Sequence, residues 1–127
     1  MKVLLSIKPE FVDKIIKGEK KYEYRKRGFK ENVDTVVIYS TKPVGKIIGE
    51  FEIQDIINYS PIYIWSKTYR YSGVSEDFFM KYFEDKNEGF ALEIGNLMIY
   101  DNPIDPKVAI ENFFPPQSFM YIEDNLF

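Results

Sequence analysis

Segments with the pattern of β-strands outnumber segments with the pattern of helices in this 127-residue chain. Alternating or continuous apolar residues predict strands at 2–7, 20–26, 34–40, 46–57, 90–94 and 98–100. Helical spacing occurs only at 9–17, 61–65 and 75–83, with a short helical segment expected at 105–110. A doubly wound sheet alternates one helix with each strand, so this ratio favours another architecture. We therefore expect one α+β domain over residues 1–127, a mixed β-barrel of about five to six strands with about three flanking helices.

The expected helices carry start and stop signals. Pro9 suits a first helical turn, and Gly18 suits the cap that ends the same helix. Ser60 and Ser75 are hydroxyl residues of the kind that cap helix N-termini. The pair Gly95 and Asn96 predicts a turn between two strands.

Strand alternation predicts which side chains share a face. In the segment 46–57, Ile47, Gly49, Phe51 and Ile53 should lie on one side of the strand. The segment 20–26 should place its tyrosines on one face and its charged residues on the other.

The chain has no cysteine and no histidine. This excludes disulfides, thiolate nucleophiles, Cys/His zinc sites and any acid–base scheme built on imidazole. Catalysis would have to use Lys, Asp or Glu, Tyr, Ser or Thr, or a hard cation bound by carboxylates. We predict no metal site and no cofactor.

No apolar run approaches the roughly 18 residues that a membrane helix needs. The first residues also lack the apolar stretch and small-residue cleavage site of a signal peptide. We expect a soluble cytoplasmic protein without a membrane partner, and the sequence carries no indication of its oligomeric state.

Positive charge is concentrated in the first part of the chain. Residues 1–50 carry 12 Lys or Arg against 7 Asp or Glu, whereas residues 51–127 carry 5 against 13. Seven of the basic residues fall within 17–30, interleaved with Tyr22, Tyr24 and Phe29. Basic groups contact phosphates and aromatic rings stack on bases, so this segment is typical of a nucleic-acid site. The alternative is the solvated face of an edge strand, with tyrosines in the core.

The segment Gly18-Glu19-Lys20-Lys21-Tyr22-Glu23-Tyr24-Arg25 resembles the G-x-K-x-x-E-x-R pattern of the ASCH domain family at all four fixed positions. The order of the surrounding segments and the ending Pro115-Pro116-Gln117-Ser118-Phe119 resemble a small prokaryotic or phage-type subgroup. The resemblance covers essentially the whole chain. It implies a PUA-like, partly open β-barrel whose cleft binds RNA.

The resemblance also implies which residues line that cleft. Gly18, Lys20, Glu23 and Arg25 occupy the motif positions, and Arg25 can fork onto a phosphate while Glu23 accepts from an amine or holds the lysine. Expected neighbours come from the end of a buried strand and from the ending loop: Tyr39, Ser40, Thr41, Gln117 and Ser118.

Three functions follow as hypotheses. The first is a module that binds RNA or a modified nucleoside, with a role in regulating transcription or translation. The second is a hydrolase with Lys20 and Glu23 as catalytic residues, acting on RNA or on N4-acetylcytidine as some family members do. In the amidohydrolase members the position of Glu23 is a threonine, so this chain departs from them. Glu50 or Glu52 would supply a second carboxylate.

The third hypothesis is a protein-interaction module. It is suggested by the aromatic residues Trp65, Tyr69 and Tyr71, which would form an interface with another protein or with a second copy.

Overall fold

The computed structural model describes all residues 1–127 and has a six-stranded sheet flanked by short helices. The strands are β1 Lys2–Ile7, β2 Tyr22–Arg25, β3 Thr35–Ser40, β4 Lys46–Tyr59, β5 Gly89–Ile104 and β6 Phe119–Ile122. The helices are α1 Pro9–Ile16, α2 Pro61–Thr68, α3 Glu76–Tyr82 and α4 Pro106–Ala109, with a 3₁₀ turn η1 at Tyr69–Tyr71. This confirms the α+β class and a sheet of about six strands, although the predicted strands 90–94 and 98–100 are parts of the single strand β5 and β6 is a further strand. None of the helices has the length and apolar character needed to cross a membrane.

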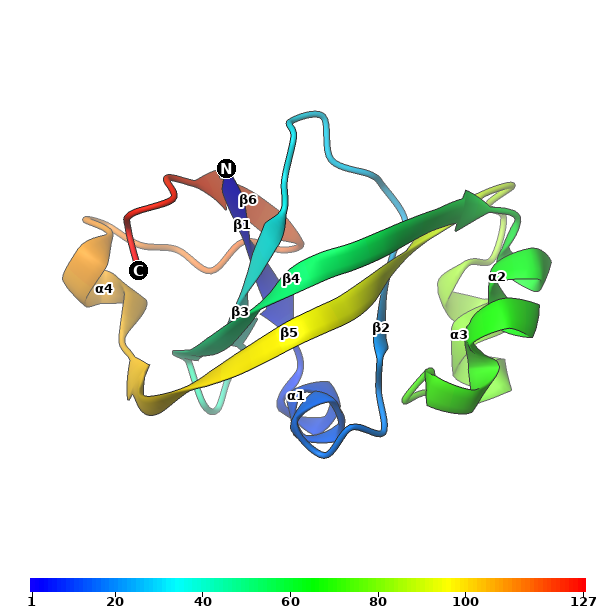
Figure 1. The fold of residues 1–127 in the computed structure, drawn as a ribbon, viewed down its shortest axis with the longest axis horizontal. Coiled ribbons are helices and arrows are strands. Elements are labelled where there is room, and N and C mark those ends of the chain that lie inside the picture. Colours follow the sequence, from blue (N-terminus) through cyan, green and yellow to red (C-terminus); the bar gives the residue numbers. More distant parts are fainter.

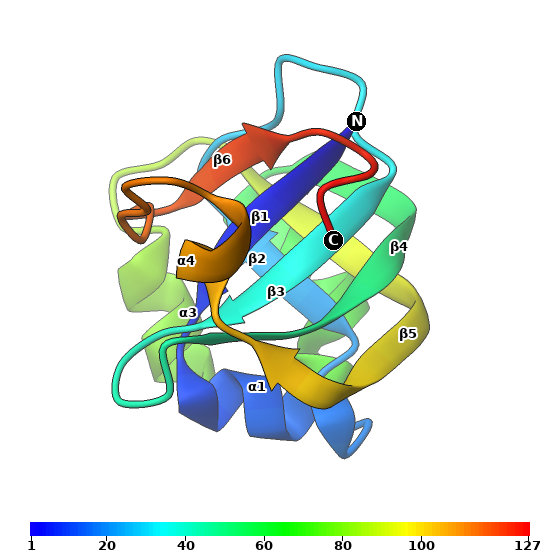
Figure 2. The ribbon, with the colours of Figure 1, turned by 90° about the vertical axis from the view of Figure 1, so that its left-hand side faces the viewer.

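The sheet is mixed and curled. Its strand order is β2-β5-β4-β3-β1-β6, with β1 parallel to β3 and all other pairs antiparallel. Figure 2 shows the sheet wrapping around the interior, with α1 below it. In Figure 1 the long strand β4 crosses the molecule toward α2, and β5 runs back in the opposite direction toward α4. Because β2 and β6 are edge strands that do not pair, the half-barrel has an open seam between them.

Two local predictions about the long strands were wrong, and both errors come from β-bulges. Gly95 and Asn96 do not form a turn, because β5 continues through them, with Asn96 at φ 40° where the register against β4 shifts. Ile47 does not share the environment of Phe51. A register shift between Ile47 and Gly49 places the Ile47 side chain in a different apolar cluster from that of Phe51.

Three apolar clusters fill the fold. The first lies between the sheet and α1 and contains Val3, Leu5, Ile7, Val12, Ile15, Val36, Ile38, Phe51 and Leu92. The second, on the other side of β1 and β3, contains Leu4, Val37, Tyr39, Ile47, Phe113 and Ile122. The third joins α2 and α3 to β2 and β5, through Tyr24, Ile64, Phe79, Phe83 and Ala91. The strands β1 and β3 are therefore buried on both faces.

The end of α1 positions the segment that follows it. Gly18 has φ +78°, its N–H donates to the carbonyl of Ile15, and the N–H groups of Glu19 and Lys20 both donate to the carbonyl of Lys14. This is a Schellman cap, which confirms the role predicted for Gly18. The cap reverses the chain so that Lys20 points back toward α1. The hydroxyls of Ser60 and Ser75 likewise cap α2 and α3.

Replacing Gly18 with alanine is expected to destabilise the fold by about 1 kcal/mol, because the left-handed conformation is unfavourable for a residue with a Cβ atom. A Cβ atom added there would meet no atom within 4 Å, so the cost is conformational and not steric. Gly18→Asn should cost less, since asparagine tolerates this region. Urea unfolding of the three proteins measures the difference, and equal stability of the alanine and asparagine variants would contradict this account.

Candidate nucleic-acid binding cleft

A cleft of about 590 Å³ opens at the seam between the two edge strands. This volume lies within the range of about 300–1,000 Å³ that is typical of ligand pockets. The wall residues come from β1, α1, β2, α3 and the loop before β6: Ser6, Ile7, Lys8, Phe11, Lys20, Glu23, Tyr24, Arg25, Lys26, Arg27, Val74, Phe78, Phe79, Tyr82, Gln117, Ser118 and Phe119. Five of them are basic and only Glu23 is acidic.

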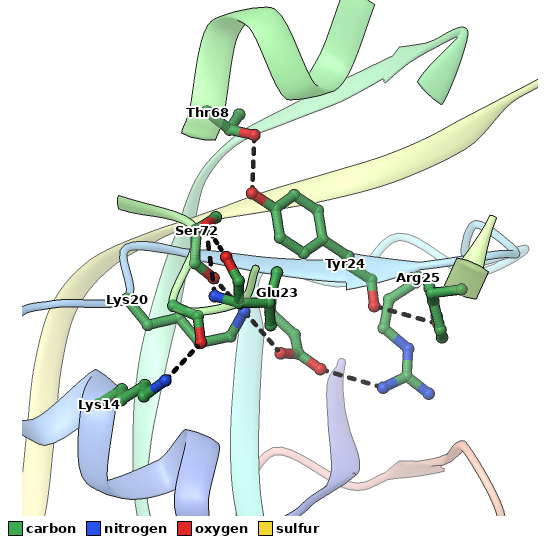
Figure 3. A network of polar contacts seen from close by, with 10 residues as sticks. Lys14, Lys20, Glu23, Tyr24, Arg25, Thr68 and Ser72 are labelled. Atoms are coloured by element: carbon green, nitrogen blue, oxygen red, sulfur yellow. Dashed lines mark hydrogen bonds and ion pairs between the residues drawn. The ribbon is translucent and has the colours of Figure 1, made fainter. Parts of the chain in front are cut away.

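Lys20 lies at the buried end of this cleft. Its side chain is 2% exposed, and its Nζ donates to the carbonyl oxygen of Ser72 at 2.8 Å and lies 3.8 Å from Oε1 of Glu23 (Figure 3). The same Nζ sits 4.7 Å from the centre of the Tyr24 ring and 5.6 Å from that of Phe11. A single lysine is therefore held by a carbonyl, a carboxylate and two aromatic faces.

Glu23 and Arg25 extend this network to the other edge of the seam. They lie on the same side of β2, as strand alternation predicts, and Nη1 of Arg25 donates to Oε2 of Glu23 at 3.1 Å. The Nη2 of Arg25 donates to Oγ of Ser118, just before β6. Figure 3 shows Lys20, Glu23 and Arg25 following one another along the cleft. Arg25 thus bridges the two edge strands.

Burial sets the protonation behaviour of the cleft. Desolvation lowers the pKa of Lys20 below its usual value, with Glu23 opposing this change and Lys14 adding to it. Desolvation also raises the pKa of Tyr24 to about 12, although its hydroxyl shares a 2.7 Å hydrogen bond with Thr68. The lysine is therefore easier to deprotonate than an exposed lysine, whereas Tyr24 keeps its proton at neutral pH.

The lowered pKa of Lys20 predicts a pH-dependent stability. At pH values between the pKa of Lys20 in the folded protein and its unfolded value of about 10.4, Lys20 is protonated in the unfolded chain but largely neutral in the folded one. The free energy of unfolding therefore rises with pH in this range. This gain in stability is lost as the pH falls through the folded pKa. Urea unfolding between about pH 7 and 10 should show the parent protein gaining stability relative to Lys20→Met. The stability difference between the parent and Lys86→Met, a change at an exposed lysine, should stay constant over this pH range. If the difference between the parent and Lys20→Met also stays constant, the prediction is contradicted.

The structure brings most of the predicted site residues together. Lys20, Glu23, Arg25, Gln117 and Ser118 all line the cleft. Gly18 does not line it but shapes the turn that delivers Lys20.

The predicted residues on β3 are placed elsewhere. Tyr39 packs on Phe113 on the far side of the sheet, and Ser40 lies beside Ile7 but is buried and outside the lining. Thr41 is also outside the lining, and its N–H donates to the carbonyl of Ile7.

The two alternative carboxylates also lie outside the cleft. Glu50 accepts hydrogen bonds from Lys2 and Tyr100, and Glu52 accepts from Asn96. Glu23 is thus the only carboxylate of the cleft, and no group of three or more acidic side chains is placed to hold a metal ion.

Several residues in the cleft or directly beside it carry no sequence signal that identifies them. Ser72 contributes its main-chain carbonyl, which any residue could supply. Gly73 packs against the stem of Lys20, where a Cβ atom would come within 2.6 Å of Lys20 Cβ. Phe11 and Phe78 lie in helices, where aromatic residues usually pack in the core, yet their rings meet at 5.5 Å and both line the cleft. A Ser-Gly pair is a turn signal, and this alone could have drawn attention to 72–73.

Comparison with known proteins identifies one family model and several similar proteins. Residues 5–100 match the family model of the ASCH domain. An ASCH domain-containing ribonuclease from Zymomonas mobilis is 30% identical over 126 residues, which is 94% of this chain and 82% of that protein. The crystal structure of ASCH from Zymomonas mobilis superposes with a TM-score of 0.89 at 28% identity, covering 98% of this chain and 90% of the other. A segment amounting to 13% of ATP synthase subunit alpha from Ureaplasma parvum is 30% identical over 105 residues, or 81% of this chain.

Proposed function

This chain belongs to the ASCH domain family, and from that premise we propose that its cleft binds RNA. One observation carries the proposal. The cleft combines five basic side chains, a single carboxylate and several aromatic rings in a volume suited to a nucleotide. Basic groups bind phosphates and aromatic rings stack on bases, whatever the sequence of the RNA.

The positions within the cleft suggest how the RNA is held. Arg25 has the planar fork that suits a phosphate, and it reaches across the seam to Ser118. Lys26 and Arg27 add positive charge beside it. The aromatic rings of Phe11 and Phe78 offer a place for a base next to Lys20.

Binding can be tested by titrating a fluorescently labelled single-stranded RNA pool with the protein and following anisotropy at two salt concentrations. Arg25→Ala is expected to weaken binding by about 10–100-fold and to reduce its salt dependence. Lys107→Ala makes the same charge change on α4, away from the cleft lining, and should leave binding unchanged (Figure 1). Equal effects of the two substitutions, or no binding by the parent protein, would overturn the proposal.

A second function, cleavage of the bound RNA, is favoured by the environment of Lys20. A buried lysine with a lowered pKa gives up its proton more readily than an exposed lysine, and Glu23 is close enough to influence that exchange. The relative from Zymomonas mobilis carries the name ribonuclease, which supports the same function here. Hydrolysis of N4-acetylcytidine has less support, because Glu23 occupies the position of the expected hydroxyl and is paired with Arg25.

The proposed step uses the RNA's own 2′-hydroxyl. Its oxygen attacks the adjacent phosphorus and forms a new P–O bond, while its proton passes to the neutral amine of Lys20. The bond from phosphorus to the 5′-oxygen breaks, and that oxygen takes the proton back from the Lys20 ammonium. Arg25 neutralises the charge that develops on the phosphate oxygens. The products are a 2′,3′-cyclic phosphate and a free 5′-hydroxyl.

This chemistry has a direct test. An RNA that carries one 2′-deoxy sugar should resist cleavage at that linkage alone, and mass spectrometry should find cyclic phosphate termini at all other cut sites. Cleavage at the 2′-deoxy linkage, or products with a 5′-phosphate, would contradict the mechanism. Binding without any cleavage would leave the RNA-binding function and remove the cleavage function.

A further inference from the structure

A second surface with the chemistry of a nucleic-acid site lies on α2 and η1, outside the cleft. Residues 56–75 contain no Asp or Glu, although 13 of the 20 acidic residues of the protein lie within 51–127. The same stretch contains four tyrosines, a lysine and an arginine. Tyr63, Tyr69 and Tyr71 are 40–49% exposed. The acidic second part of the chain therefore contains a stretch that is aromatic and basic.

Each of these three tyrosines has its own cation. Lys67 Nζ lies 5.5 Å from the Tyr63 ring centre, the Arg70 guanidinium lies 5.9 Å from that of Tyr69, and Lys21 Nζ lies 4.3 Å from that of Tyr71. We call Tyr63, Tyr69, Tyr71 and these three cations the tyrosine surface. In an exposed pair of this kind the interaction is weak, so a base can replace the cation on the ring while the cation binds a phosphate.

The tyrosine surface lies next to the buried end of the cleft, and residues 71–74 separate the two. The N–H of Lys21 donates to the carbonyl of Tyr71 at 2.8 Å, and the next residue, Ser72, holds Lys20 through its own carbonyl. Gly73 packs on the Lys20 side chain, and Val74 lines the cleft. The segment 71–74 is thus the wall between the two sites, and the neighbouring residues Lys20 and Lys21, just before β2, serve one site each.

We propose that single-stranded RNA held in the cleft continues over the tyrosine surface, with bases on the tyrosine rings and phosphates at the paired cations. The inference rests on the proposed RNA binding and extends it to the length of RNA that is bound. A repeat of one ring and one cation matches the repeat of one base and one phosphate in an RNA strand. An apolar protein surface has no anionic groups to bind a cation beside each ring, so the pairing of rings and cations favours RNA as the partner.

Length-dependent binding tests this inference. We would compare a labelled RNA of about 4 nucleotides, which the cleft can hold alone, with one of about 12 nucleotides, since known single-strand sites span about 4–16 nucleotides. The parent protein should bind the longer RNA more tightly. The combined Tyr63→Ala, Tyr69→Ala and Tyr71→Ala variant should lose about tenfold or more in affinity for the longer RNA and less than about twofold for the shorter one. Ile62→Ala, on the same helix and 75% exposed, removes no ring and should change neither.

The outcomes separate the two proposals. If the parent binds the short RNA without gaining from length, or if the triple variant keeps the gain, the tyrosine surface has no role in RNA binding while the cleft proposal stands. Equal losses on both RNAs would also overturn the inference. If the parent binds neither RNA, both proposals fail. Self-association of the parent that the triple variant loses in sedimentation, with RNA affinity unchanged, would instead assign this surface to contact between copies of the chain.

Discussion

Replacing Lys20 with methionine is expected to lower the rate of RNA cleavage by about 10²–10⁴-fold, the usual contribution of a positioned acid or base. Methionine keeps the unbranched apolar stem that packs against Gly73 but has no amine to exchange a proton. Glu23 retains Arg25 as a partner in this variant, so it is not left as an unpaired buried charge. The loss should therefore appear in the rate of the bound complex more than in the affinity for RNA.

Two further variants separate proton transfer from charge. Lys20→Arg keeps the positive charge but does not deprotonate, so it should remain as slow as Lys20→Met. Lys86→Met, at an exposed lysine outside the cleft, should cleave at the parent rate. Single-turnover rates across pH provide the measurement, and the parent rate should rise as Lys20 loses its proton. Full activity of Lys20→Arg would show that the site needs only a cation.

The local geometry of the motif was largely predictable from sequence, because it depends on neighbours in the chain. Helix capping explains Gly18, and strand alternation explains why Glu23 and Arg25 share a side. The partners that complete the site come from far along the chain. Ser72 is 52 residues from Lys20, and Ser118 is 93 residues from Arg25. Such contacts depend on how the sheet curls, and a main-chain acceptor leaves no trace in the residue type.

The curl of the sheet also explains the error at Ile47, whereas Tyr39 follows the regular alternation of β3 and lies with Val37 in the second apolar cluster. Strand alternation assumes a constant register, and one extra residue moves every later side chain to the other face. The register between β3 and β4 shifts at Ile38 and Tyr39, and that between β4 and β5 shifts three times. These bulges bend the long strands into a half-barrel, and the seam left open between β2 and β6 becomes the cleft. Bulges have weak sequence signals, so the elements were predictable while their curvature was not.

Replacing Glu23 with glutamine should destabilise the fold by about 3–5 kcal/mol, as expected when one partner of a buried ionic network is removed. Glu23 is 7% exposed and lies between the cations of Lys20 and Arg25. Glutamine preserves the shape but leaves those cations without a counter-charge. Because Glu23 supports the protonated form of Lys20, the cost should shrink as the pH rises and the lysine becomes neutral.

A double-mutant cycle tests the origin of this cost. Glu23→Gln combined with Lys20→Met should be less destabilised than the sum of the single variants, since the second change removes one of the two stranded cations. Glu88→Gln, which changes an exposed carboxylate outside the cleft, should alter stability by no more than about 0.5 kcal/mol. Urea unfolding at about pH 7 and 9 supplies all the values. If the losses in stability of the two single variants add up in the double variant at both pH values, Glu23 acts through packing or through Arg25 alone. The polar network would then hold Arg25 in place without controlling the protonation of Lys20.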